Sequence, residues 1–179
     1  MFESEATKFQ HAGIQIGADS TQAEEQLLAE SISPFSIVRR NQALEMARLY
    51  AVLHCFENEI REYIRETLNE KEGVDWWSKL PPKMKAHAES RQETALKDSW
   101  LEGEKSDLLG FIDFGMLTAI IIEKWQHFNN VIPSQHWLKQ RMEELEKVRN
   151  FIAHNRVLLP TEYQRVYMYI SDWNRVIGL

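Results

Sequence analysis

The feature that most constrains the fold is a long stripe of apolar residues that recur at intervals of three and four positions. Its members are Leu49, Leu53, Phe56, Ile60, Ile64 and Leu68. This spacing places the side chains on one face of an α-helix. Ser33 and Pro34 are residue types that cap and begin a helix, and Gly73 is a type that ends one. We therefore predict one helix of roughly 35 residues, or ~50 Å at 1.5 Å per residue, as the backbone of the fold.

The rest of the chain predicts more helices and no sheet. Glycine (7) and proline (5) are scarce in the 179 residues, and no run alternates in the manner of a strand. Further helices are expected from apolar spacing and capping residues over about 21–31, 83–104, 113–128 and 134–155, and from a capping box that begins at Thr161. The predicted fold is all-α, an up-and-down bundle of about five to six helices.

Charge divides the chain into an arm and a domain. The net charge is −6, yet residues 1–33 contain six acids and one base. We expect residues 1–33 to form an acidic arm with one short helix, and residues 34–179 to form the helical domain. Within residues 139–156 five bases outnumber three acids. A small basic site is therefore compatible with the negative total.

Several functional classes have no support in the sequence. Cys55 is the single cysteine, so no internal disulfide or cysteine zinc cage can form. No signal peptide is apparent, and no apolar run approaches the length of a membrane span. The histidines form no HExxH or comparable cluster, and no glycine-rich phosphate loop occurs. We expect a cytoplasmic protein without a metal, a cofactor or a membrane partner.

The octapeptide RNFIAHNR, residues 149–156, interrupts an otherwise ordinary amphipathic helix. At 100° per residue, Arg149 lies about 40° from the centre of the buried stripe of that helix, whereas His154 lies about 140° further round. Asn150 lies about 40° from His154. On one straight helix Arg149 and His154 cannot hold the same small group.

Two arrangements resolve this geometry, and each residue also has an ordinary structural explanation. The helix could loosen near Asn155, or two helices from two subunits could share Arg149 and His154 across an axis. A guanidinium close to a core needs an anion, because an unpaired buried charge costs several kcal/mol. Glu57 on the long helix is a candidate partner, one turn from Arg61. A lone histidine in a last turn is also stabilised by the helix dipole.

The octapeptide and four other segments together resemble a known family. RNFIAH matches the Arg-x4–6-His signature of HEPN domains, the nucleotide-binding helical bundles of higher eukaryotes and prokaryotes. The resemblance extends in order through LYAVLHCFENEIREYI (49–64), DWW (75–77), IDFGMLTAIIIEKWQHF (112–128) and DW (172–173). It is closest to the type found at the C-terminus of a eukaryotic nuclear mRNA-surveillance endoribonuclease and as stand-alone bacterial proteins.

The resemblance implies a helical bundle that dimerises and places two Arg-x4-His segments at a shared cleft. It implies that Arg149 and His154 carry catalysis. The residues expected to support them or to contact RNA are Asn150, Asn155, Arg156, Glu57 and Arg61.

The expected function is metal-independent cleavage of single-stranded RNA. The 2′-hydroxyl of RNA is the nucleophile, so the products carry 2′,3′-cyclic phosphates. The role could be that of a toxin, a defence protein or an RNA-surveillance enzyme, with an antitoxin or nucleotidyltransferase-type partner. The alternatives are an RNA- or nucleotide-binding module without cleavage and a structural helical dimer regulated by a partner protein.

Overall fold

All elements that the structure describes are helical. The structure is a computed structural model that describes residues 18–98, 103 and 105–178, and no strand occurs among them. The predicted all-α fold is thus confirmed. The six α-helices are α2 (Ala18–Ile32), α3 (Ile37–Glu72), α4 (Pro82–Lys97), α5 (Phe114–Glu123), α6 (Gln135–Ala153) and α7 (Pro160–Ile177), and three short 3-10 helices are η1 (Trp76–Lys79), η2 (Leu108–Phe111) and η3 (Trp125–His127).

The chain divides into two compact units, Met1–Glu45 and Met46–Leu179. The first unit contains α2, which covers the predicted short helix at 21–31. The predicted boundary between arm and domain, at 33/34, falls in the turn between α2 and α3. Residues 1–17 of the expected arm lie outside the described residues.

The predicted start of the long helix is wrong by one turn. Ser33 and Pro34 form a turn in which the Ser33 N–H donates to the Glu30 carbonyl. The helical ladder begins when the Arg40 N–H donates to the carbonyl of Ser36. A serine-proline pair permits a helix start, but here α2 continues to Ile32 and its exit turn occupies these two residues.

The predicted stripe on α3 is the core of the second unit. Its buried residues are Met46, Leu49, Leu53, Phe56, Glu57, Ile60, Ile64 and Leu68. Trp173 of α7 is 1% exposed and lies edge-on to two aromatic rings of α3, with centroids 5.9 Å from Phe56 and 5.8 Å from Tyr63. Gly73, at φ 86°, ends α3 in a conformation that glycine adopts readily. The long helix therefore serves as the backbone of the bundle.

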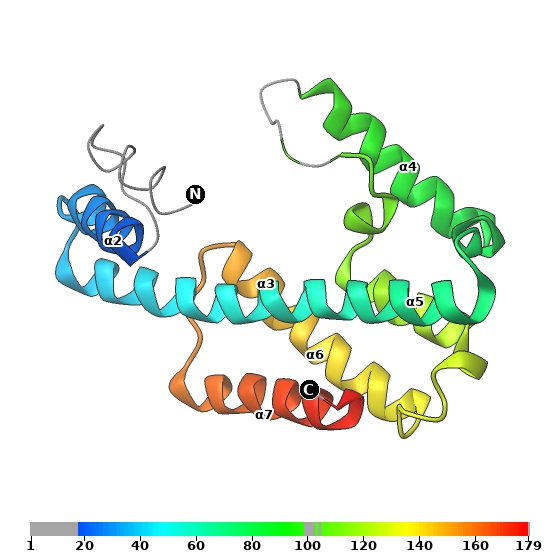
Figure 1. The fold of residues 1–179 in the computed structure, drawn as a ribbon. Coiled ribbons are helices and arrows are strands. Elements are labelled where there is room, and N and C mark those ends of the chain that lie inside the picture. The colour runs from blue at the N-terminus through cyan, green and yellow to red at the C-terminus, as the bar shows by residue number, and fades with distance from the viewer. Residues whose placement is uncertain (1–17, 99–102, 104, 179) are drawn as a thin grey trace, which may run out of the picture. The chain divides into compact units, whose positions relative to one another are not determined.

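The helices that follow α3 build the rest of this unit (Figure 1). Helix α5 packs against α6, and α6 packs against α7. The short connection 154–159 joins α6 to α7, so the octapeptide lies at the point where the chain turns back. Helix α4 contributes one fully buried side chain, Ala88, in agreement with its polar sequence. The predicted helix 83–104 ends at Lys97, and residues 99–102 and 104 lie outside the described part.

Two further helix boundaries differ from prediction. Asp113 caps α5 as expected, because its carboxylate accepts the Met116 N–H at 3.0 Å. However, α5 ends at Glu123, and η3 replaces the predicted continuation to residue 128. Helix α7 begins at Pro160 rather than at Thr161, because proline suits the first position and Glu162 accepts the Leu159 N–H at 2.6 Å.

Two ion-pair clusters link these helices. Glu72, at the end of α3, accepts a hydrogen bond from Lys124 at 2.9 Å and lies 2.9 Å from His127 Nε2. Arg141 of α6 donates to Asp172 of α7 at 2.9 Å. Both clusters are largely shielded from solvent, so they fix the bundle rather than cover its surface.

Candidate functional site

The octapeptide occupies the last turn of α6 and the residues that follow it. Helix α6 begins with Ser134, whose hydroxyl accepts the Trp137 N–H at 3.1 Å. Four residues of the predicted stripe are buried, and Val148 is half-buried. They are Leu138, Met142, Leu145 and Ile152. Packing of this stripe determines which way the octapeptide faces.

The helix ends inside the octapeptide through a Schellman motif. Asn155 adopts φ 57°, the only positive φ at a non-glycine residue in the described part of the chain. Its N–H donates to Ile152 O at 2.9 Å, and the Arg156 N–H donates to Phe151 O at 3.2 Å. These are the two bonds of that motif, and asparagine tolerates the left-handed conformation that it requires. His154 is consequently the C-cap residue and leaves the helical ladder.

This helix end agrees with one of the two arrangements expected from the sequence. The ideal angle of about 140° between Arg149 and His154 assumed a continuous helix. The helix instead stops at Ala153. His154 is therefore the first residue of the α6–α7 connection, and its side chain does not lie on a regular helical face.

Arg149 pairs with a carboxylate, and its guanidinium keeps N–H donors that bond to no other residue in the described part of the chain. Its Nε lies 3.6 Å from Glu57 Oε2, an ion pair longer than a hydrogen bond. Its Nη1 donates to Asn150 Oδ1 at 3.1 Å. The Arg149 side chain is 35% exposed. The expected partner, Glu57, is present, yet part of the guanidinium stays open to a ligand.

Glu57 is the buried anion that joins two arginines. Its side chain is 9% exposed, and its other oxygen accepts a hydrogen bond from Arg61 Nη2. Arg61 also donates to the carbonyls of Leu109 at 3.3 Å and Ile112 at 3.1 Å. Arg61 therefore fixes Glu57 between α3 and η2. Glu57 in turn positions Arg149 on α6.

The remaining predicted residues lie on the surface. His154, Asn150, Asn155 and Arg156 are exposed. Among the residues that the structure describes, no hydrogen bond or ion pair involves the His154 ring. The structure thus brings Arg149, Glu57 and Arg61 into one network, with His154 five residues along the chain at the helix end.

Phe151 is a neighbour of the site that sequence reasoning missed. The Arg156 guanidinium lies over the Phe151 ring, 5.3 Å from its centroid. This contact joins the two positions that a Schellman motif brings together. Asparagine at residue 155, a type favoured at this position, is the sequence signal that could have revealed it.

The side chains supply acid–base and anion-binding chemistry. An exposed imidazole can take or give a proton near neutral pH, and a guanidinium can bind a phosphate with fixed geometry. In the described residues, no group of three or more His, Cys, Asp or Glu side chains could hold a metal ion. The helices described here include none long and apolar enough to cross a membrane.

One known family matches most of the chain. The profile described as Swt1-like HEPN matches residues 51–178, more than two thirds of the chain. The chain belongs to the HEPN domain family, as the resemblance predicted. Neither the curated proteins nor the solved structures include a match. Membership of this family indicates an RNA-related function in a broad sense, in a family that is generally nuclease-like.

Proposed function

We propose that this chain is an endoribonuclease that cleaves single-stranded RNA without a metal ion. The observation that supports this most strongly is the end of α6. There a guanidinium with free donors, Arg149, and an unengaged imidazole, His154, flank the last helical turn. Both groups suit a phosphodiester that carries its own nucleophile.

In this proposal RNA provides the attacking oxygen. The 2′-oxygen forms a bond to phosphorus, the bond from phosphorus to the 5′-oxygen breaks, and the products are a 2′,3′-cyclic phosphate and a 5′-hydroxyl. His154 accepts the proton of the 2′-hydroxyl, a contribution typically worth about 10²–10⁴ in rate. Arg149 binds the phosphate oxygens while negative charge accumulates on them. DNA has no 2′-hydroxyl and is not cleaved.

A homodimer completes the proposed site. In-line displacement places the attacking and leaving oxygens on opposite sides of the phosphorus. One His154 cannot lie on both sides, so a second copy of it would protonate the leaving 5′-oxygen. Two octapeptides that face each other supply one base and one acid.

The supporting residues have separate roles in this proposal. Glu57 and Arg61 position Arg149, because they fix its carboxylate partner. Asn150 orients the Arg149 guanidinium through their hydrogen bond. Asn155 turns the chain so that His154 leaves the helix. Arg156 binds RNA.

A regulated cellular role fits such an activity. We propose action in the cytoplasm as a toxin, a defence protein or an RNA-surveillance enzyme, with an antitoxin or nucleotidyltransferase-type partner that restrains it. Toxicity on expression that His154→Ala relieves would support this role. Equal toxicity of that variant would contradict it.

The direct test is incubation of the purified chain with end-labelled single-stranded RNA in EDTA. The wild type should cleave, and His154→Ala should lower the rate by about 10²–10⁴. His136→Ala is the matched control, because His136 is an exposed histidine at the opposite end of α6. RNA binding without cleavage by the wild type would favour the non-catalytic module. Neither binding nor cleavage would favour the structural dimer.

A further inference from the structure

A groove between α6 and α7 opens beside the octapeptide. It encloses about 340 Å³, near the lower end for small-ligand sites. Its lining residues are Glu144, Leu145, Lys147, Val148, Glu162, Arg165, Val166 and Tyr169. Glu162 also accepts the Leu159 N–H, so the groove ends at the connection that carries His154.

The groove is lined by two carboxylates, which are already engaged, and by two cationic side chains that can turn to an anion. Glu144 accepts hydrogen bonds from Tyr169 at 2.9 Å and Arg165 at 3.4 Å, and Glu162 is engaged with the backbone. Lys147 has no such partner among the described residues. Arg165 is 66% exposed and its contact with Glu144 is long, so the guanidinium can turn to a phosphate at little cost.

Tyr169 adds an uncharged side chain to the lining of the groove. Burial raises the pKa of its phenol, and the hydrogen bond to Glu144 raises that pKa further. The hydroxyl therefore stays protonated and donates to Glu144. The phenol therefore adds no negative charge of its own to the groove, and its hydrogen bond holds the Glu144 carboxylate against α7.

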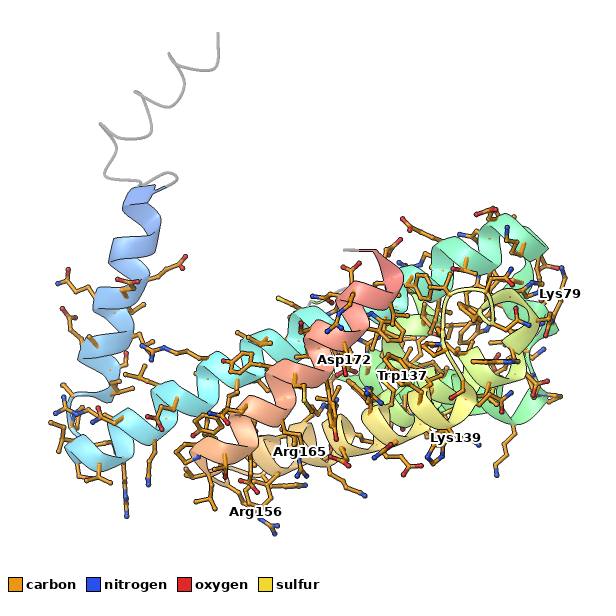
Figure 2. The ribbon with its side chains drawn as sticks, turned by 90° about the horizontal axis from the view of Figure 1, so that it is seen from below. Lys79, Trp137, Lys139, Arg156, Arg165 and Asp172 are labelled. Carbon is orange, nitrogen blue, oxygen red and sulfur yellow. The ribbon has the colours of Figure 1, made fainter. Side chains whose placement is uncertain are left out.

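A flat cationic surface lies at the end of the groove nearest the octapeptide. Phe151 is one helical turn beyond Lys147 and Val148, which line the groove. The Arg156 guanidinium lies over the Phe151 ring, 5.3 Å from its centroid, and Arg156 is exposed. Unpaired RNA bases stack on such arginine planes. Figure 2 shows Arg156 and Arg165 toward the same end of the bundle, whereas Lys139 lies toward the other end of α6.

We propose that this groove binds one nucleotide of a single-stranded RNA beside the octapeptide, with its base on the Arg156 guanidinium and its phosphate between Lys147 and Arg165. The proposal rests on the proposed function only in taking RNA as the ligand. It adds a reason for selecting single strands, since a base paired in a duplex cannot reach the Arg156 plane. It also makes Phe151 a positioning residue, because its ring supports Arg156.

The test measures binding separately from cleavage. The probe is a fluorescein-labelled single-stranded 2′-O-methyl RNA, which has no free 2′-hydroxyl and cannot be cut. Lys147→Gln should weaken its binding about fivefold and reduce the salt dependence of the affinity by about one phosphate contact. Lys139→Gln, an exposed lysine on the same helix, should change neither.

Variants of the two arginines separate stacking from charge. Arg156→Lys keeps the charge but loses the plane, and it should weaken binding about fivefold or more, the lower end of the effect of one base stack. Phe151→Leu should have an effect in the same direction. Arg165→Gln should weaken binding, whereas Arg175→Gln should not, although Arg175 is likewise an exposed arginine of α7 that pairs with an acid.

The outcomes distinguish this proposal from the proposed function. If Lys147→Gln and Arg156→Lys bind the probe as the wild type does while the wild type cleaves RNA, the groove proposal is overturned and the nuclease stands. If these variants lose binding while the wild type never cleaves, the groove proposal stands and the nuclease fails. A duplex probe that binds as tightly as the single strand would also overturn the groove proposal.

Discussion

Helix α6 carries two arginines next to the core, Arg141 in its first half and Arg149 in its second, and the contrast between them separates structure from function. Arg141 donates to Asp172 through Nη2 at 2.9 Å and Nε at 3.3 Å, and it lies over the rings of Trp137 and Tyr169, with centroid distances of 4.3 and 5.4 Å. Arg149 has one hydrogen bond to its neighbour and a 3.6 Å ion pair. The first arginine is fully engaged, and the second is available.

The two carboxylates each pair with two arginines, and they differ in which arginine they hold more closely. Asp172 accepts two hydrogen bonds from Arg141 through Oδ2, at 2.9 and 3.3 Å, and its Oδ1 accepts one from the exposed Arg175 at 3.1 Å. Glu57 pairs with both Arg61 and Arg149, and its contact with Arg61 is the shorter one. A phosphate can therefore compete for Arg149 without leaving Glu57 unpaired. Arg141 is less open to such an exchange, because each of its three nitrogens donates a hydrogen bond to Asp172 or to the Trp137 carbonyl, and its guanidinium also lies over two aromatic rings.

The largest expected effect concerns activity. Arg149→Ala should lower the rate of RNA cleavage by about 10²–10³, the cost of removing one donor to a developing oxyanion. Arg141→Ala should leave the rate per folded molecule unchanged. Single-turnover cleavage, normalised to the folded fraction from circular dichroism, measures both. If the two variants lost the same fraction of the cleavage rate, the distinction between Arg141 and Arg149 would be wrong.

Stability should show the reverse order. Arg141→Ala should lower the free energy of unfolding by about 2 kcal/mol, because Asp172 loses its main partner and two aromatic rings lose a cation. Arg149→Ala should cost less than about 1 kcal/mol, since Glu57 keeps Arg61. Urea unfolding of both variants is the measurement. A larger loss for Arg149→Ala would mean that Arg149 is a structural residue.

Acid should destabilise the bundle through Glu72, far along the chain from the octapeptide. Hydrogen bonds from Lys124, first, and His127 lower the pKa of Glu72 below its ordinary value of 4.5, although burial opposes them. A lowered pKa stabilises the fold above the unfolded value, and this contribution disappears as the pH falls through the folded value.

The wild type should therefore lose stability more steeply than Glu72→Gln as the pH falls below about 4.5. Glu66→Gln, an exposed residue on the same helix, is the control and should follow the wild type. Thermal unfolding at a series of pH values gives the comparison. Parallel curves for the wild type and Glu72→Gln would show that this pair contributes nothing.

The smallest effect concerns the left-handed residue of the octapeptide. Asn155→Ala should lower the free energy of unfolding by about 1 kcal/mol, because a Cβ is disfavoured at φ 57°. Asn155→Gly should stay within about 0.5 kcal/mol of the wild type. Chemical denaturation of the pair tests the Schellman end of α6. Identical values for alanine and glycine would indicate that the turn is not held in this conformation.

Periodicity made the helices predictable, and local chemistry predicted only some of their ends. The stripes on α3 and α6 repeat over many turns, so their buried faces were correctly predicted. The starts of α3 and α7 were misplaced because Ser33-Pro34 and Thr161 fit a capping pattern, while Ser36 and Pro160 fit the actual chain path. Several acceptable caps within one turn cannot be ranked without the neighbouring helix.

The candidate site was predictable to a similar extent. The Glu57–Arg149 pair followed from one charge near a core and one acid on the long helix. The contact between Arg141 and Asp172 did not, because it joins residues 31 positions apart and depends on how α6 and α7 pack. The α6–α7 groove depends on the same packing, whereas the contact between Phe151 and Arg156 follows from the local Schellman motif.

The most direct test of the central claim uses a labelled DNA strand that contains a single ribonucleotide, incubated with the purified chain in EDTA. The proposed chemistry predicts one cut, immediately 3′ of the ribonucleotide, and mass spectrometry should find a 2′,3′-cyclic phosphate on one fragment and a 5′-hydroxyl on the other. His154→Ala should leave the strand intact over the same time. Cleavage at deoxynucleotides, or cleavage that appears only when Mg²⁺ is added, would contradict the claim that the Arg149–His154 segment cuts RNA through its own 2′-hydroxyl.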